Sequence, residues 1–249
     1  MVERGRRLIV GLRRAVRRPR PWTPSGLLVL SLVCATPAWS GAQREEALSD
    51  AVRHALHAAI AQQAPPQPGH ADVTGAQGFE AWLRQTHSRL QTLLAARSRQ
   101  RGATTPPLAG LAHELDAPAL QRELLQTVWY ESRRAGLDPA LVLAVIEVES
   151  GFRKFAVSPA GARGYMQVMP FWSRLLVGGD ASELFHGQTN LRYGCVILRH
   201  YLDLEQGDLA LALGRYNGSR GQMAYPRAVL AAQKQWARIA GPSVSEPGP

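Results

Sequence analysis

The 249-residue sequence contains only two cysteines, Cys34 and Cys195, and few segments that alternate between apolar and polar residues as strands do. Two cysteines exclude a disulfide framework and a cysteine-based zinc cluster. The apolar run at 26–35 has about ten residues, whereas a membrane-spanning helix needs roughly 20. With 45% hydrophobic and 19% charged residues the chain can still bury a core, so we expect a folded, mainly α protein.

The net charge of +10 is concentrated at the start of the chain. The first 25 residues hold eight arginines against one acid, Glu3, which gives them a net charge of +7 and leaves +3 for residues 26–249. Because the basic charge belongs mostly to this leader, a DNA-binding function loses its main support. No nucleic-acid partner is expected.

The first 42 residues follow the order of a secretory signal peptide. An arginine-rich stretch precedes the apolar run at 26–35, and small residues follow at 36–42. We expect cleavage near residues 38–42 and export to the periplasm, whereas an uncleaved leader would associate with the membrane. Cleavage removes Cys34, and the apolar neighbours at 196–198 predict that Cys195 is buried and unreactive.

The rest of the chain divides into three regions. A helical N-terminal region with Pro/Gly-rich linkers at 64–69 and 104–107 occupies 43–111, a catalytic-size domain occupies 112–240, and a disordered tail occupies 241–249. The periodicity predicts one helix over 43–63 and another from about residue 79. These helices are interpreted as packing or tethering elements, and binding of an envelope protein through 43–110 stays open.

Within the domain the spacing of apolar residues predicts four helices, at 116–136, 138–149, 190–204 and 208–215. Asp116 and Asp138 are expected N-caps, and Pro139 suits a first helical turn because no N–H is needed there. The helix at 138–149 is apolar nearly all round and should lie inside the domain.

Two acids end this apolar helix, Glu147 and Glu149, and they point in roughly opposite directions. Glu149 shares a ridge with Val142, Val145 and Ile146, and both these neighbours and the negative end of the helix dipole disfavour its charged form. A glutamate so placed keeps its proton to higher pH and can act as a general acid. The alternative is a solvated glutamate at a helix end.

Several short blocks follow Glu149 in order. They are Glu-Ser-Gly-Phe at 149–152, Ser-Pro-Ala-Gly-Ala at 158–162, Gly-Tyr-Met-Gln-Val-Met-Pro at 164–170, Asn-Leu at 190–191 and Arg-Tyr-Asn-Gly at 215–218. Over about residues 115–240 this set resembles the soluble lytic transglycosylase (SLT)-like family, whose fold is that of goose-type lysozyme. The resemblance implies a lysozyme-like SLT catalytic domain that acts on peptidoglycan glycan strands.

The resemblance also implies roles for individual residues. Glu149 matches the single catalytic acid/base, and Glu147 is left as a structural or exposed residue. Substrate binding is implied for Ser158, Gly164, Met166, Gln167, Met169, Tyr216 and Asn217, with the last two facing the catalytic glutamate. Tyr165 and Arg215 depart from the leucine and alanine usual in the family. No cofactor or metal is expected, since His54 and His57 lack a third ligand at a recognisable spacing.

The implied activity is that of a lytic transglycosylase, which cleaves the MurNAc-β-1,4-GlcNAc bond without water and leaves 1,6-anhydro-MurNAc ends. Hydrolytic glycosidases usually need two carboxylates, and the other candidate acids lie in other segments: Asp180, Glu183, Asp203, Glu205 and Asp208. A transglycosylase needs only one, because the attacking 6-hydroxyl is tethered to the substrate. A lysozyme-like muramidase and a non-catalytic peptidoglycan-binding scaffold remain alternatives.

Overall fold

A computed structural model describes residues 43, 45, 47–61, 73–102, 115 and 117–240. Several sequence-based predictions lie outside the described residues: the signal peptide at 1–42, the linkers at 64–69 and 104–107, the N-cap at Asp116 and the tail at 241–249.

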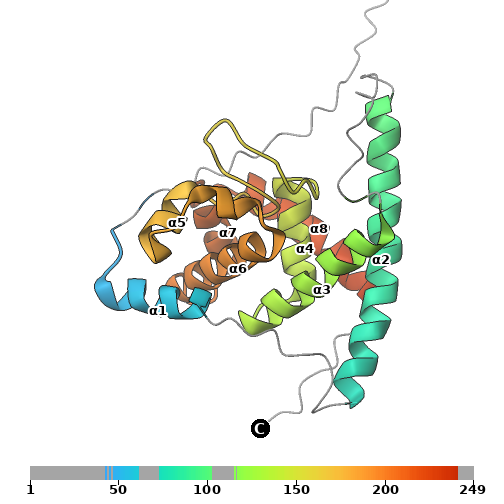
Figure 1. The fold of residues 1–249 in the computed structure, drawn as a ribbon, viewed down its shortest axis with the longest axis horizontal. Helices are drawn as coiled ribbons and strands as arrows, with labels where there is room; N and C mark the ends of the chain where they lie inside the picture. Colours follow the sequence, from blue (N-terminus) through green and yellow to red (C-terminus); the bar gives the residue numbers. More distant parts are fainter. Residues whose placement is uncertain are drawn as a thin grey trace, which may run out of the picture. The chain divides into compact units, whose positions relative to one another are not determined.

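The described part of the chain is mainly helical, as predicted (Figure 1). Its elements are α1 (Asp50–Ala61), α2 (Val73–Gly102), α3 (Pro118–Arg134), α4 (Pro139–Glu149), α5 (Pro170–Val177), the 3-10 helix η1 (Ala181–Phe185), α6 (Gly187–Leu204), α7 (Leu209–Asn217) and α8 (Ala224–Ala240). Over these residues β pairing is limited to two isolated bridges in the loop at 150–169. None of the described helices is both long and apolar enough to cross a membrane.

The predicted helices differ from the observed ones chiefly at their boundaries. The helix expected from residue 43 begins at Asp50, and the helix expected from about residue 79 begins at Val73. The prediction omitted α5, η1 and α8. The signal for α8 is present in the sequence, because Tyr225, Val229 and Trp236 have helical spacing and all three are buried.

Helix α4 lies in the core and packs against α3 and α8 (Figure 1). Every residue from Ala140 to Ile146 is buried, which confirms the prediction of an internal helix. Its start is also as predicted: Asp138 accepts a hydrogen bond from the Ala140 amide at 2.9 Å, and Pro139 is the first helical residue. The last residue of the helix is Glu149.

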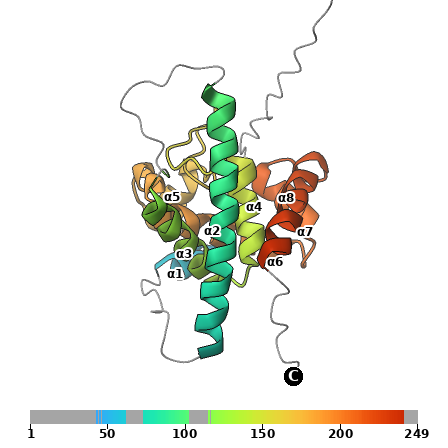
Figure 2. The same cartoon turned by 90° about the vertical axis from the view of Figure 1, so that its right-hand side faces the viewer.

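The two N-terminal helices pack into the same core as the rest. Helix α1 buries Leu56 and Ile60 and contacts α5 and α6. Helix α2 crosses α3 and α8, as Figure 2 shows from its outer side, and it buries Phe79, Leu83 and Leu90. Both helices therefore serve as the packing elements that the sequence indicated.

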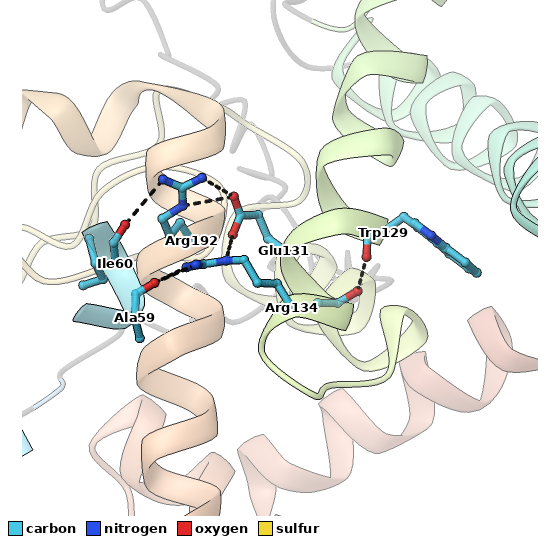
Figure 3. A network of polar contacts seen from close by, with 7 residues as sticks. Ala59, Ile60, Trp129, Glu131, Arg134 and Arg192 are labelled. Atoms are coloured by element: carbon cyan, nitrogen blue, oxygen red, sulfur yellow. Dashed lines mark hydrogen bonds and ion pairs between the residues drawn. The ribbon is translucent and has the colours of Figure 1, made fainter. Parts of the chain in front are cut away.

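A buried ion-pair network fixes the end of α1 (Figure 3). The Glu131 side chain is 1% exposed, and its two oxygens meet Arg134 Nε at 3.2 Å and Arg192 Nη2 at 3.0 Å. Arg134 Nη1 also donates to the Ala59 carbonyl at 2.7 Å, and Arg192 Nη1 donates to the Ile60 carbonyl at 3.4 Å. The last carbonyls of a helix lack partners within it, so these two arginines cap α1 and hold it against α3 and α6.

Candidate active site

Glu149 is the centre of the candidate site. Its residue is 6% exposed, and Tyr225 donates a hydrogen bond from Oη to Glu149 Oε1 at 2.7 Å. The other oxygen, Oε2, is buried and has no hydrogen-bond partner among the described residues. Burial raises the pKa of Glu149 to about 8, although the hydrogen bond from Tyr225 acts in the opposite direction. The carboxyl group therefore holds a proton at neutral pH.

Tyr225, the only side chain that hydrogen-bonds the Glu149 carboxyl group in the described structure, was missed by the sequence reasoning. It lies at the start of α8, fully buried, 76 positions after Glu149. The helical spacing of Tyr225, Val229 and Trp236 could have indicated a buried residue here. The spacing contains no information on which acid the hydroxyl group would meet.

The structure places Tyr216 close enough to Glu149 for an electrostatic interaction. Tyr216 is fully buried and donates from Oη to the Met166 carbonyl at 2.7 Å. Burial is the main cause of its raised pKa, and the charge of Glu149 adds to it. Asn217 follows at the end of α7, where its Oδ1 accepts from Ser219 Oγ at 3.1 Å. Its buried Nδ2 has no partner in the described part of the chain.

The loop at 150–169 is fastened to α6 through Asn190. Asn190 Oδ1 accepts from the Met166 amide at 2.8 Å, and its Nδ2 donates to the carbonyls of Leu184 and Arg163, each at 2.8 Å. Gly164 has a φ of +77°, and a Cβ there would lie 2.3 Å from Asn190 Nδ2. A side chain at this position would therefore separate the loop from the helix.

The other predicted binding residues also belong to this loop. Ser158 Oγ accepts from the Ala162 amide at 3.1 Å and closes a turn. Gln167 has a φ of +50° and donates from Nε2 to the carbonyls of Gly164 at 2.9 Å and Ala156 at 3.2 Å. Met166 is fully buried, and Met169 is half-buried at the start of α5. Met166 and Gln167 thus support the loop from inside.

Met166 packs closely on α6. A Cβ on Gly194 would lie 2.4 Å from Met166 Sδ, so the loop can approach this helix only because position 194 is glycine. Together with the hydrogen bond from Tyr216 to the Met166 carbonyl, this contact joins the loop, α6 and α7 beside the glutamate.

The alternative carboxylates named from the sequence serve other purposes in the described structure. Asp180 and Asp208 cap η1 and α7 through the amides of Ser182 and Leu211. Asp203 pairs with Arg199 on α6. Glu205 pairs with Arg220 and Arg215, and these hydrogen bonds lower its pKa to about 2. Glu183 lies near Tyr193. Burial is the main cause of the raised pKa of Tyr193, and the negative charge of Glu183 raises it further.

Glu147 has a structural contact, as predicted. Its Oε2 accepts a hydrogen bond from Trp236 Nε1 at 2.8 Å, which joins α4 to α8. Glu147 and Glu149 are only two positions apart, yet their environments differ: Glu147 accepts a hydrogen bond from the indole of Trp236, and Glu149 accepts one from the hydroxyl group of Tyr225.

The remaining candidates give no second site. Cys195 is buried, as predicted, and burial raises the pKa of its thiol well above the ordinary value. His54 and His57 are exposed on α1. Across the part of the chain that the structure describes, no three His, Cys, Asp or Glu residues form a group that could hold a metal ion.

These features define a helical domain built around one buried, protonated glutamic acid at the end of its central helix. Comparison with known protein families then gives the particular family: residues 127–238 match the transglycosylase SLT domain. The match assigns this lysozyme-like domain, which is less than half of the chain, to the SLT-like family.

Several curated relatives match the same part of the chain. A membrane-bound lytic murein transglycosylase C from Actinobacillus pleuropneumoniae is 34% identical over 130 residues, which are 51% of this chain and 33% of the relative. The protein of that name from Glaesserella parasuis is 38% identical over 110 residues, 42% of this chain and 28% of the relative. A transglycosylase of Enterobacteria phage PRD1 is 33% identical over 97 residues, covering 39% and 35%. The chain thus spans about a third of the length of these relatives.

Proposed function

We propose that this chain is a peptidoglycan lytic transglycosylase that cleaves the MurNAc-β-1,4-GlcNAc bond and leaves 1,6-anhydro-MurNAc ends. The observation that carries the proposal is the state of Glu149, a buried carboxyl group that keeps its proton up to a pH of about 8. The match of residues 127–238 to the SLT domain supports the same activity, and so do the relatives named lytic murein transglycosylase.

The first step is protonation of the leaving group by Glu149. Tyr225 occupies Oε1, so the proton is delivered from Oε2, the oxygen without a partner in the described structure. As the proton moves to the glycosidic oxygen, the bond from that oxygen to C1 of MurNAc breaks and both bonding electrons leave with the oxygen. The neighbouring 2-acetamido group stabilises the positive charge that develops at C1.

The second step closes the anhydro ring. Glu149, now a carboxylate, takes the proton of the MurNAc 6-hydroxyl group while that oxygen bonds to C1. Glu149 returns to its protonated form, so proton transfer balances over one turnover. No second carboxylate is required, because the nucleophile belongs to the substrate and has a high effective concentration. The structural uses of Asp180, Asp203, Glu205 and Asp208 support this one-acid mechanism.

Tyr225 and the substrate-binding residues complete the proposal. The Tyr225 hydroxyl group fixes the carboxyl group and stabilises the carboxylate formed in the first step. The loop residues Ser158, Gly164, Met166, Gln167 and Met169, with Tyr216 and Asn217, form or support the binding surface for the glycan. The partner is peptidoglycan in the cell envelope, and the arginine-rich leader supports export to the periplasm. An uncleaved leader would instead anchor the protein to the membrane, and an envelope partner for 43–110 is the last part of the proposal.

Product analysis tests the function. Purified protein is incubated with peptidoglycan, and the released muropeptides are weighed by mass spectrometry. Anhydromuropeptides, one water lighter than the reducing forms, support the proposal. Reducing ends would instead indicate the muramidase alternative, and binding without release would indicate the scaffold alternative.

The variant Glu149→Gln tests the acid. Its amide cannot deliver the proton, so we expect a loss of at least about a hundredfold in the release rate, with glycan binding retained. Glu123→Gln, on the exposed face of α3, is the matched control and should release product at the normal rate. Product release by Glu149→Gln at the rate of the control would refute the assignment.

A further inference from the structure

The chain makes an unusual turn directly after Glu149. Gly151 and Phe152 both have positive φ, +61° and +64°. A non-glycine residue in this region is strained and keeps its conformation only where its surroundings impose it. Phe152 is fully buried, so packing around its ring imposes the turn.

Helix α2 supplies a cation to this turn. Arg97 Nη2 lies 3.5 Å from the Glu147 carbonyl, and its guanidinium carbon lies 6.0 Å from the centre of the Phe152 ring. A Cβ on Gly151 would be 2.7 Å from Arg97 Nη1, so the guanidinium rests directly on the Gly151 backbone. A positive charge at this place also favours the carboxyl-terminal end of α4.

A second arginine of α2 extends the same contact to α8. The guanidinium carbon of Arg89 lies 4.7 Å from the ring centre of Trp236. Trp236 in turn packs edge-on against Phe152, at 5.8 Å between ring centres, and donates to Glu147 at 2.8 Å. Helices α2, α4 and α8 are therefore joined behind the turn that follows Glu149, and α8 also provides Tyr225.

We propose that Arg97 is a positioning residue for Glu149: its guanidinium holds the strained turn at 151–152 and the Glu147 carbonyl near the end of α4, and thereby keeps the acid buried. This proposal rests on the proposed function. It assigns a role in the reaction to a helix that lies outside the SLT match at 127–238. Without Arg97 the end of α4 loosens, water reaches the carboxyl group, and Glu149 loses its proton at lower pH.

Three variants test the role of Arg97. Arg97→Met keeps an unbranched side chain without charge or donors, Arg97→Lys restores the charge, and Arg84→Met removes an exposed arginine from the same helix. With soluble glycan strands as substrate, we expect Arg97→Met to lower kcat about tenfold, with a Kd close to that of wild type. We also expect the alkaline limb of its pH–rate profile to fall at lower pH. Arg97→Lys should recover part of both changes, and Arg84→Met should match wild type.

A readout without turnover separates this proposal from the proposed function. Glu149 makes the stability of the wild type fall as pH rises from about 4.5 to about 8. In Arg97→Met the upper end of that pH range should move down, as measured by urea unfolding at several pH values. If Arg97→Met does not fold, Arg97→Lys carries both measurements. A lower Tm with unchanged kcat, alkaline limb and pH range would show a merely structural role and overturn the proposal.

Discussion

Two glutamates are buried in different regions of this molecule, and their neighbours give them different roles. Glu131, where α1, α3 and α6 meet, is 1% exposed and contacts two arginines (Figure 3). Glu149, at the end of α4, is 6% exposed and accepts a hydrogen bond from one tyrosine. Burial is therefore similar, while the charge supplied by the surroundings differs.

The difference shows what makes a buried acid useful for chemistry. A carboxylate beside two guanidinium groups can stay charged, because ion pairs and hydrogen bonds offset the loss of water. A carboxyl group in apolar surroundings keeps its proton instead, since desolvation disfavours the charged form. The first arrangement holds helices together, and the second leaves a proton that can be given away.

The largest effect that would test this comparison is the dependence of stability on pH. Above pH 4.5 the unfolded chain releases the Glu149 proton, whereas the native protein keeps it until about pH 8, so rising pH favours unfolding across this range. At about 1.4 kcal/mol per pKa unit, the wild type should lose up to about 5 kcal/mol relative to Glu149→Gln. Urea unfolding of both proteins from pH 4 to pH 9 measures it. Parallel curves would show that Glu149 titrates normally.

The second test removes the charge of the other glutamate. Glu131→Gln leaves Arg134 and Arg192 buried without their counter-ion, and loss of one partner of a buried ion pair costs about 3–5 kcal/mol. Urea unfolding at pH 7 should show this loss, and the cleavage rate per folded molecule should stay normal. Glu123→Gln, exposed on the same helix, is the control. A stability equal to that of the control would mean that the pair contributes nothing.

The smallest effect concerns Tyr225, whose hydroxyl group donates a hydrogen bond to Glu149. Tyr225→Phe removes a hydrogen bond that stabilises the carboxylate, so the pKa of Glu149 should rise further and the alkaline limb of the pH–rate profile should move up. The rate at pH 7 should fall about tenfold, the effect of losing one hydrogen bond to a charged group. Rates with soluble glycan strands across pH 6–10 measure both. An alkaline limb that moved down would contradict this account of Tyr225.

The positions of the helices were predictable where local signals are strong. Asp138 and Pro139 mark the start of α4, and its continuous apolar sequence marks it as internal. The predicted start of α1 was wrong by seven residues, because helical spacing defines a helix face better than its ends. Helix α8 was missed although the spacing of Tyr225, Val229 and Trp236 indicates it. The order of short blocks after Glu149 indicated the SLT-like family, which the family comparison confirmed.

The contacts of Tyr225 and Arg97 were not predictable, since each residue comes from a distant part of the chain. Tyr225 meets Glu149 across 76 positions, and Arg97 meets the Glu147 carbonyl across 50. Met166 is fully buried and packs against Gly194. No periodicity or spacing specifies such contacts, because they depend on how helices cross.

By itself the sequence determined that an acid would end an apolar helix, because helical periodicity and capping act over a few residues. Only the tertiary structure decided what that acid became. Desolvation by the surrounding helices raises its pKa to about 8, even though the hydrogen bond from the Tyr225 hydroxyl group of α8 lowers it. These effects depend on how the helices pack in three dimensions, and the local sequence around Glu149 does not specify them.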